Sequence, residues 1–106
     1  MPKKGDIILV AFPFTDLSGE KLRPALVVGV SRYHVVTLFI TSRSTGERRW
    51  QIAITASAES GLIVPSFARC DKIASFDMRI VTGRIGRAGP SALKAVDAKL
   101  RILFGI

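Results

Sequence analysis

Glycine and proline interrupt this chain about every ten residues, and the segments between them are short and apolar. Many of these segments are rich in Val, Ile, Phe and Thr, which favour strands. The pattern predicts strands over residues 6–12, 24–30, 33–40, 49–54, 62–68, 72–76 and 78–85, and a helical turn over 57–61. Strands of this length and spacing indicate a mainly β fold, a small barrel of about six or seven strands.

The last segment of the chain has the period of an amphipathic helix. Pro90 suits the first helical position, and either Gly89 or Ser91 can cap the helix. Its apolar face consists of Leu93, Val96, Leu100, Leu103 and Phe104. We expect this C-terminal helix to pack on the barrel. Because so small a barrel leaves apolar surface and strand edges to cover, we also expect a homodimer.

The chain is strongly basic. Its 106 residues suit one domain with a single core, which we take as residues 1–106. Sixteen Lys and Arg against eight Asp and Glu give a net charge of +8, and ten of the basic residues are arginine. Arginine binds phosphate well, so we expect a polyanionic partner: nucleic acid first, an acidic protein second, an anionic membrane third. A basic domain without such a partner is the alternative.

Few residues could hold a metal or act as a nucleophile. A single cysteine, Cys70, excludes an internal disulfide and a cysteine-based zinc site, and His34 is the only histidine. We read His34 as a turn or strand-edge residue and Cys70 as a small buried one. The apolar run 7–10 is too short to span a bilayer, and no signal peptide follows Met1. We therefore expect no metal, no cofactor, no membrane association and a cytoplasmic location.

The segment 5–28 places Arg23-Pro24 where a polar turn meets an apolar strand. The proline restricts the backbone beside a side chain that is charged at any physiological pH. Further polar groups stand at two later strand ends, Thr41-Ser42-Arg43 and Arg69-Cys70-Asp71. In a small barrel, strand ends that are distant in sequence can converge on one rim. We therefore expect these groups to meet near Arg23.

Cleavage of RNA without a metal needs only such groups. A base takes the proton of the ribose 2′-OH, a cation stabilises the phosphorane, and an acid protonates the leaving 5′-oxygen. Asp71 could be the base, Arg23 the phosphate clamp, Thr41 a hydroxyl donor, and Arg69 a clamp or the acid. The plainer alternatives are that Arg69 and Asp71 form a cross-strand ion pair, and that the Thr41 side chain satisfies the hydrogen bonding of a turn.

A basic loop carries the one tryptophan of the chain. Arg43, Arg48, Arg49 and Trp50 combine cations with a large aromatic ring, the mixture that holds single strands by phosphate contact and base stacking. Alternatively, Trp50 is a core or dimer-interface residue and the arginines are solvated.

Three motifs, in order, resemble one family. The opening GDI…FPFTD…SG.K.RPALVV, the strand-end Ile40-Thr41-Ser42, and Arg69-Cys70-Asp71 with the downstream Ser75-Phe76-Asp77-Met78 are similar to the MazF/PemK toxins, including Kid. The helix closing on Leu103-Phe104-Gly105-Ile106 is similar too.

The resemblance implies an SH3-like barrel, a homodimer, and cleavage of single-stranded RNA to 2′,3′-cyclic phosphate and 5′-OH ends without a metal. It places Arg23 and Thr41 in the catalytic site and matches Arg69 and Asp71 to an acid and base pair. We predict that the RNA contacts come from Asp16, Lys21, Pro24, Ser42, Arg43, Arg48, Arg49 and Trp50. The first loop, 15–21, departs from the pattern of some relatives.

The function predicted is that of a toxin: a sequence-selective endoribonuclease that is neutralised by a small acidic antitoxin. Two alternatives remain open. One is a gyrase inhibitor similar to CcdB, whose C-terminus resembles Phe104-Gly105-Ile106 but has a tryptophan before the glycine. The other is an RNA-binding barrel without turnover.

Overall fold

The structure, a computed structural model, describes residues 1–13, 20–44 and 47–106. Its strands are β1 (Asp6–Pro13), β2 (Glu20–Val30), β3 (His34–Thr41), β4 (Gln51–Ile54), β5 (Ser66–Asp77) and β6 (Val81–Arg87). Two short 3₁₀ helices, η1 (Arg48–Trp50) and η2 (Met78–Ile80), precede β4 and β6, and α1 (Pro90–Phe104) ends the fold. The strands form one sheet in the order β4-β5-β3-β2-β1-β6, with antiparallel neighbours.

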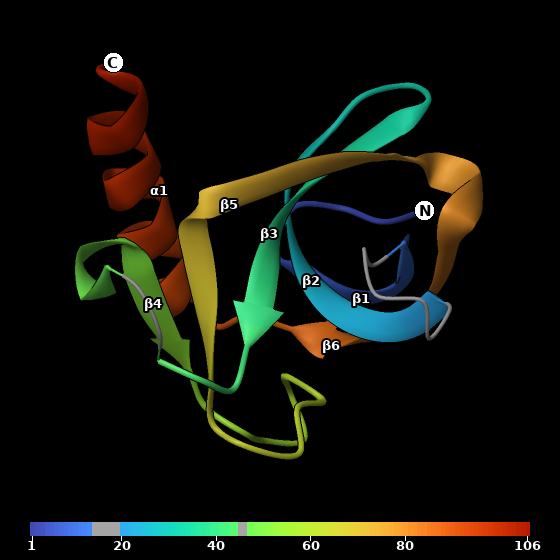
Figure 1. Cartoon of the computed structure of the whole chain (residues 1–106), viewed down its shortest axis with the longest axis horizontal. Helices are drawn as coiled ribbons and strands as arrows, with labels where there is room; N and C mark the ends of the chain where they lie inside the picture. Colours follow the sequence, from blue (N-terminus) through green and yellow to red (C-terminus); the bar gives the residue numbers. More distant parts are fainter. Residues whose placement is uncertain (14–19, 45–46) are drawn as a thin grey trace.

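The mainly β fold with a C-terminal helix is confirmed. The sheet curls strongly on itself, and α1 lies beside β4 at one end of it (Figure 1). Among the described residues, the edge strands β4 and β6 do not pair with each other, so the sheet is incompletely closed. The strand count agrees with the lower of the two expected values.

Strand β5 differs most from expectation, because one long strand replaces the two predicted over 62–68 and 72–76. Leu38 pairs with Ile73, but the next residue, Phe39, pairs with Arg69. Residues 70–72 are therefore an insertion in the ladder, and they bend β5 sharply, so that its first half runs beside β4 and its second crosses the molecule (Figure 1). The predicted break is a bulge within a strand, and the strand begins only at Ser66.

Two other predicted strands were too long at their starts. The segment 49–54 opens with η1 before β4, and 78–85 opens with η2 before β6. The predicted turn over 57–61 is confirmed as a single helical turn, in which the Gly61 amide donates to the Ser57 carbonyl at 2.9 Å.

Apolar side chains fill both faces of the sheet. Ile7 and Ile8 are fully buried neighbours on β1, yet they belong to different clusters because successive strand residues point to opposite faces. The cluster under α1 comprises Ile7, Leu26, Leu38, Ile40, Ile54, Leu62, Ala68, Cys70, Ala88 and Val96. The other comprises Ile8, Val10, Ala25, Val27 and Val35. Burial on both faces explains why β1 and β2 are almost continuously apolar.

Helix α1 begins after Gly89, with Pro90 in the first turn, and ends at Gly105, whose φ of 71° is left-handed. Val96 is fully buried, and Leu93 and Leu100 pack beside it. Phe104 was expected on this apolar face, but it is 57% exposed. Since the helix extends past the edge of the sheet, none of the described strands covers its last turn (Figure 1).

Cys70 is fully buried in the cluster under α1, as expected for a small apolar residue. Burial, with a smaller contribution from the Asp71 carboxylate, raises the pKa of its thiol from 9.0 to about 11. The thiol is therefore protonated and unreactive at neutral pH.

The raised thiol pKa predicts a loss of stability in alkali. Above pH 9.0 the unfolded chain ionises Cys70 while the folded chain keeps its proton until about pH 11, so the free energy of unfolding falls as the pH rises through this window. Urea unfolding at about pH 8 and pH 10.5 should show a fall about 2 kcal/mol larger in the wild type than in Cys70→Ala. Equal falls in the two proteins would contradict this assignment.

Candidate functional site

The beginning of β2 and the end of β3 meet the loop before β5 at a cavity of about 670 Å³. Its lining is Arg23, Pro24, Phe39, Ile40, Thr41, Ser42, Arg43, Leu62, Ile63, Val64 and Ser66. The structure thus brings together five residues predicted for the site, from two separate motifs: Arg23 and Pro24, and Thr41, Ser42 and Arg43. Cavities that bind ligands have volumes of roughly 300–1,000 Å³.

Strand register brings Arg23 and Thr41 to one face. Ala25 on β2 pairs with Phe39 on β3, and the strands are antiparallel. Arg23 lies two residues before Ala25, and Thr41 lies two residues after Phe39, so both point the same way at the same end of the ladder. The Thr41 hydroxyl oxygen accepts a hydrogen bond from the Arg43 amide at 3.1 Å, which tightens the turn after β3.

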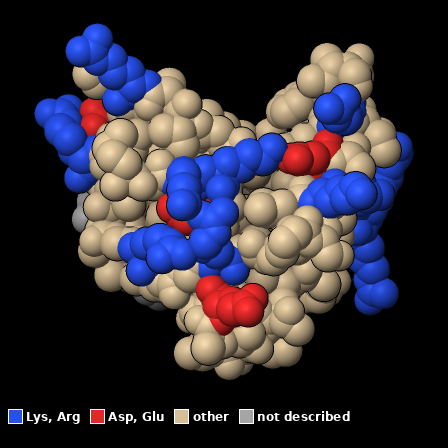
Figure 2. All heavy atoms as spheres, turned by 180° about the vertical axis from the view of Figure 1, so that it is seen from behind, with Lys and Arg blue, Asp and Glu red and all other residues tan. Residues whose placement is uncertain are grey.

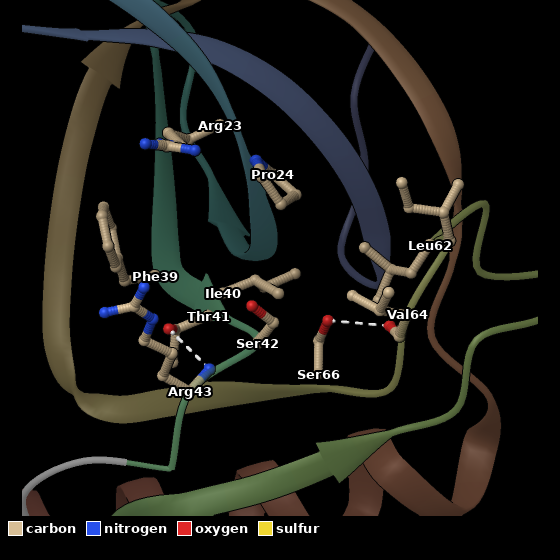
Figure 3. A pocket seen from close by; sticks show the side chains of 11 residues that line it. Arg23, Pro24, Phe39, Ile40, Thr41, Ser42, Arg43, Leu62, Val64 and Ser66 are labelled. Carbon is tan, nitrogen blue, oxygen red and sulfur yellow. Dashed lines mark hydrogen bonds between the residues drawn. The ribbon is translucent and has the colours of Figure 1, made fainter.

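The cavity has two unlike halves. Arg23, Phe39, Thr41 and Arg43 project to one side of the two strands (Figure 3). The other residues that Figure 3 labels lie on the other side, and most of them are apolar: Pro24, Ile40, Ser42, Leu62, Val64 and Ser66 (Figure 3). One half therefore offers guanidinium groups and a hydroxyl, and the other offers mainly aliphatic carbon.

Arg69 and Asp71 lie outside this lining. They form an ion pair within β5, with Arg69 Nη2 3.2 Å from Asp71 Oδ2, rather than the cross-strand pair considered from the sequence. Arg69 pairs with Phe39 across the β3–β5 ladder, and residues directly opposite each other share a face. The pair thus borders the cationic half of the cavity beyond Phe39. Arg69 Nε is buried and lacks a hydrogen-bond partner among the described residues.

Sequence reasoning did not place Phe39 or its neighbour Lys72 at the site, nor the other lining residues Ile40, Leu62, Ile63, Val64 and Ser66. Phe39 lies in the cationic half of the cavity and pairs with Arg69 across the β3–β5 ladder, and the Lys72 ammonium sits 4.4 Å from the centroid of the Phe39 ring. Lys72 belongs to the bulge of β5. It directly follows the Arg69-Cys70-Asp71 motif, but only the bend in the strand turns it toward β3.

The Trp50 side chain packs partly against the core, so its ring is only partly accessible for base stacking. Its half-buried ring contacts the cluster under α1, its indole N–H donates to Glu47 Oε2 at 3.0 Å, and the Arg49 guanidinium lies 4.6 Å from the ring centroid. Arg48 and Arg49 are exposed on η1. None of the three lines the cavity.

Asp16 and Lys21 are the two remaining predicted contacts, and the structure places Lys21 in β2 rather than in a loop. Asp16 lies outside the described residues, and Lys21 is placed by its backbone alone, opposite Phe12 in the β1–β2 ladder. His34 is exposed at the start of β3, as expected of a strand-edge residue. Across the described ranges, no group of three or more His, Cys, Asp and Glu side chains could hold a metal ion.

Basic side chains also spread over the face opposite the view of Figure 1 (Figure 2). Some of them are structural. Asp6 is 2% exposed, and its Oδ1 lies 2.6 Å from Arg87 Nη1 and 3.1 Å from Arg84 Nε. A buried carboxylate requires such partners, so the net charge overstates the cations that are free for a polyanion. No described helix is long and apolar enough to cross a membrane.

Comparison with known proteins agrees with this architecture. MazF from Deinococcus radiodurans superposes with a TM-score of 0.78 at 23% identity, covering 99% of this chain and 97% of that one. An endoribonuclease from a mycobacterial species, solved with its cognate antitoxin, gives 0.78 at 16% identity, over 100% and 97% of the two chains. The Mycobacterium tuberculosis toxin MazF-mt6 gives 0.76 at 18% identity, over 95% and 97%.

At these identities the superpositions show the fold. A search of the curated proteins found no matching sequence. The family model of the PemK-like, MazF-like toxins of type II toxin–antitoxin systems matches residues 3–104, nearly the whole chain. This protein therefore belongs to the PemK-like, MazF-like toxin family.

Proposed function

We propose that this protein is the toxin of a type II toxin–antitoxin module and a metal-independent, sequence-selective endoribonuclease acting on single-stranded RNA. The observation that carries the proposal is the cavity in which Arg23, Thr41 and Arg43 converge from β2 and β3. Family membership supports it, as does the fold shared with a mycobacterial protein described as an endoribonuclease.

The proposed reaction is transesterification. The ribose 2′-oxygen attacks the adjacent phosphorus and loses its proton, the P–O5′ bond breaks, and the 5′-oxygen takes up a proton. A 2′,3′-cyclic phosphate and a 5′-OH end result. Arg23 would bind the non-bridging oxygens, whose negative charge grows in the phosphorane. Because the Thr41 oxygen accepts from the Arg43 amide, its own proton is free to donate to one of these oxygens.

Arg69 and Asp71 take the proton-transfer roles in this proposal. Asp71 is the base for the 2′-OH, and Arg69 holds the phosphate or assists the leaving oxygen. Their position beyond Phe39 requires the RNA backbone to cross that ring between Arg23 and the ion pair. Arg69 Nε is buried and has no partner among the described residues, so it would donate to a phosphate oxygen only once the side chain has moved.

The other residues predicted to contact RNA form two groups, one that lines the cavity and one that lies on η1. Pro24, Ser42 and Arg43 line the cavity and would contact the nucleotides nearest the cut. Arg48 and Arg49 are exposed on η1 and would hold phosphates farther along the strand. Base stacking on Trp50 would require the Arg49 guanidinium to leave the ring. Contacts from Asp16 and Lys21 stay predictions of the sequence.

The test is an incubation of the purified protein with a long single-stranded RNA in EDTA, followed by mapping of the cut sites and of the end chemistry. We expect cuts at a recurring short sequence, with 5′-OH and cyclic phosphate ends. Binding without cuts would instead support the silent RNA-binding barrel. Intact RNA together with gyrase-dependent DNA breaks would support the CcdB-like alternative.

The proposed partners are a small acidic antitoxin and a second copy of this chain. Structures of relatives include MazE–MazF complexes from Deinococcus radiodurans and the mycobacterial enzyme with its antitoxin. A net charge of +8 would attract an acidic peptide as well as RNA.

We assign the homodimer contact to the end of α1, where Ile102, Phe104 and Ile106 are 54%, 57% and 84% exposed. This patch has no acidic or basic side chain of its own, so it suits a copy of itself better than an acidic peptide. Light scattering should give twice the mass of one chain, and Ile102→Asp with Phe104→Asp should give the mass of one. Ile80→Asp, a control at a 42% exposed isoleucine on η2, should stay dimeric. A wild-type monomer would refute the assignment.

A further inference from the structure

Two successive aliphatic side chains that line the cavity are exposed. Ile63 is 94% exposed and Val64 is 46% exposed, and both line the cavity that holds Arg23. We call these two residues the apolar lip. Isolated exposed aliphatic residues are common on protein surfaces, but two in succession at the mouth of a cationic cavity are not explained by chance exposure alone.

The lip is held firmly in place. Leu62, the preceding residue, is buried in the cluster under α1, and its amide donates to the Ser60 hydroxyl oxygen at 3.2 Å. On the other side, the Ser66 hydroxyl donates to the Val64 carbonyl at 3.0 Å (Figure 3). The exposure of Ile63 and Val64 therefore belongs to an anchored loop, and the exposed carbon is available to a ligand without rearrangement.

The division of the cavity matches the chemistry of a nucleotide. A phosphate needs the guanidinium groups of Arg23 and Arg43, whereas the faces of an unstacked base need apolar contact. Among the described residues that line the cavity there is no Trp or Tyr, and the Phe39 ring lies in the cationic half with Lys72 over it. Within this part of the chain, apolar contact for a base comes from aliphatic side chains.

Resting on the proposed ribonuclease function, we propose that the apolar lip and Pro24 hold an unstacked base of the RNA whose adjoining phosphate is bound by Arg23 and Arg43. The Ser42 hydroxyl lies in the same half of the cavity and can bond to the base edge (Figure 3). The lip would thus contribute to which nucleotide is accepted beside the cut, and it would act through binding rather than through proton transfer.

The test measures binding to a fluorescent RNA oligonucleotide that carries the mapped cut sequence, with 2′-deoxyribose at the cut nucleotide to prevent turnover. A series of oligonucleotides places an abasic residue at each position in turn. The variant is Ile63→Ser with Val64→Ser, and Ile80→Ser on η2 is the control, because its isoleucine is exposed but lies outside the cavity lining. Circular dichroism and thermal unfolding check that both variants fold.

We expect the double variant to weaken binding of the intact oligonucleotide about tenfold, within the range that contact with one base provides. For one abasic position next to the cut, wild type and variant should bind equally, because the contacted base is already absent. Equal losses on every oligonucleotide, or no loss, would overturn the proposal. If the wild type cuts no RNA, the ribonuclease function fails, and the same abasic series along an unmodified oligonucleotide still decides whether the lip holds a base.

Discussion

Arg23→Ala should lower kcat/KM for single-stranded RNA about 100- to 1,000-fold, the usual cost of removing one donor that stabilises a developing oxyanion. The guanidinium lies near the beginning of β2, on the face that carries Thr41, where the phosphorane would form. Because the charge on the phosphoryl oxygens grows toward the transition state, the loss should fall mainly on kcat. Quenched-flow or fluorogenic RNA assays would measure it.

Two further variants sharpen this expectation. Arg23→Lys keeps a positive charge but loses the planar fork of donors, so it should recover only part of the lost activity. Arg101→Ala, in the last turn of α1, removes an exposed arginine that does not line the cavity and should leave the rate within about twofold. If Arg23→Ala lowers kcat/KM by less than about threefold and has the same melting temperature as the wild type, Arg23 is not a catalytic residue.

Gly86→Ala should destabilise the fold by about 3 kcal/mol or more, because overpacking against backbone cannot be relieved by a rotamer change. A Cβ at Gly86 would stand 2.3 Å from the Glu59 carbonyl oxygen and from the Ser60 carbonyl carbon. In the same contact the Arg87 amide donates to the Glu59 carbonyl at 2.7 Å. Backbone thus packs directly on backbone between β6 and the loop that leads to the apolar lip.

Gly83→Ala on the same strand is the matched control, because a Cβ there would meet nothing within 4 Å. Urea unfolding should show little change for it and a large loss for Gly86→Ala. Where Gly86→Ala still folds, it should also weaken RNA binding, since the loop of Leu62, Ile63 and Val64 must shift away from β6. Equal stability of the two variants would show that the loop yields without cost.

The elements that depend on local chemistry could be predicted from the sequence. The core segments of β1, β2 and β3 are apolar and β-branched between Gly and Pro, and they lie within one or a few residues of the expected bounds. Helix α1 begins at Pro90 and ends before the left-handed Gly105, because a proline and a glycine each impose a backbone preference without any neighbour.

The errors arose where distant residues compete with local preference. The segment 62–68 has the composition of a strand, but Leu62 packs under α1 and Ile63 and Val64 become the exposed lip. No residue type in the segment 69–77 predicts a bulge. The segment bends because β3 pairs with it in two registers, at Arg69 and again at Ile73. Such pairing involves residues about thirty positions apart, which local propensity does not describe.

The sequence by itself determined a basic, mainly β domain with a C-terminal helix, the toxin family, and the residues that could carry the chemistry. Tertiary structure alone decided how these residues meet. The register of β2 on β3 brings Arg23 and Thr41 to the same face of the sheet. Arg69 and Asp71 lie at the bulge in β5, where they form an ion pair outside the cavity lining. The physical reason is that a register shift of one residue moves a side chain to the other face of the sheet, and only long-range pairing sets that register.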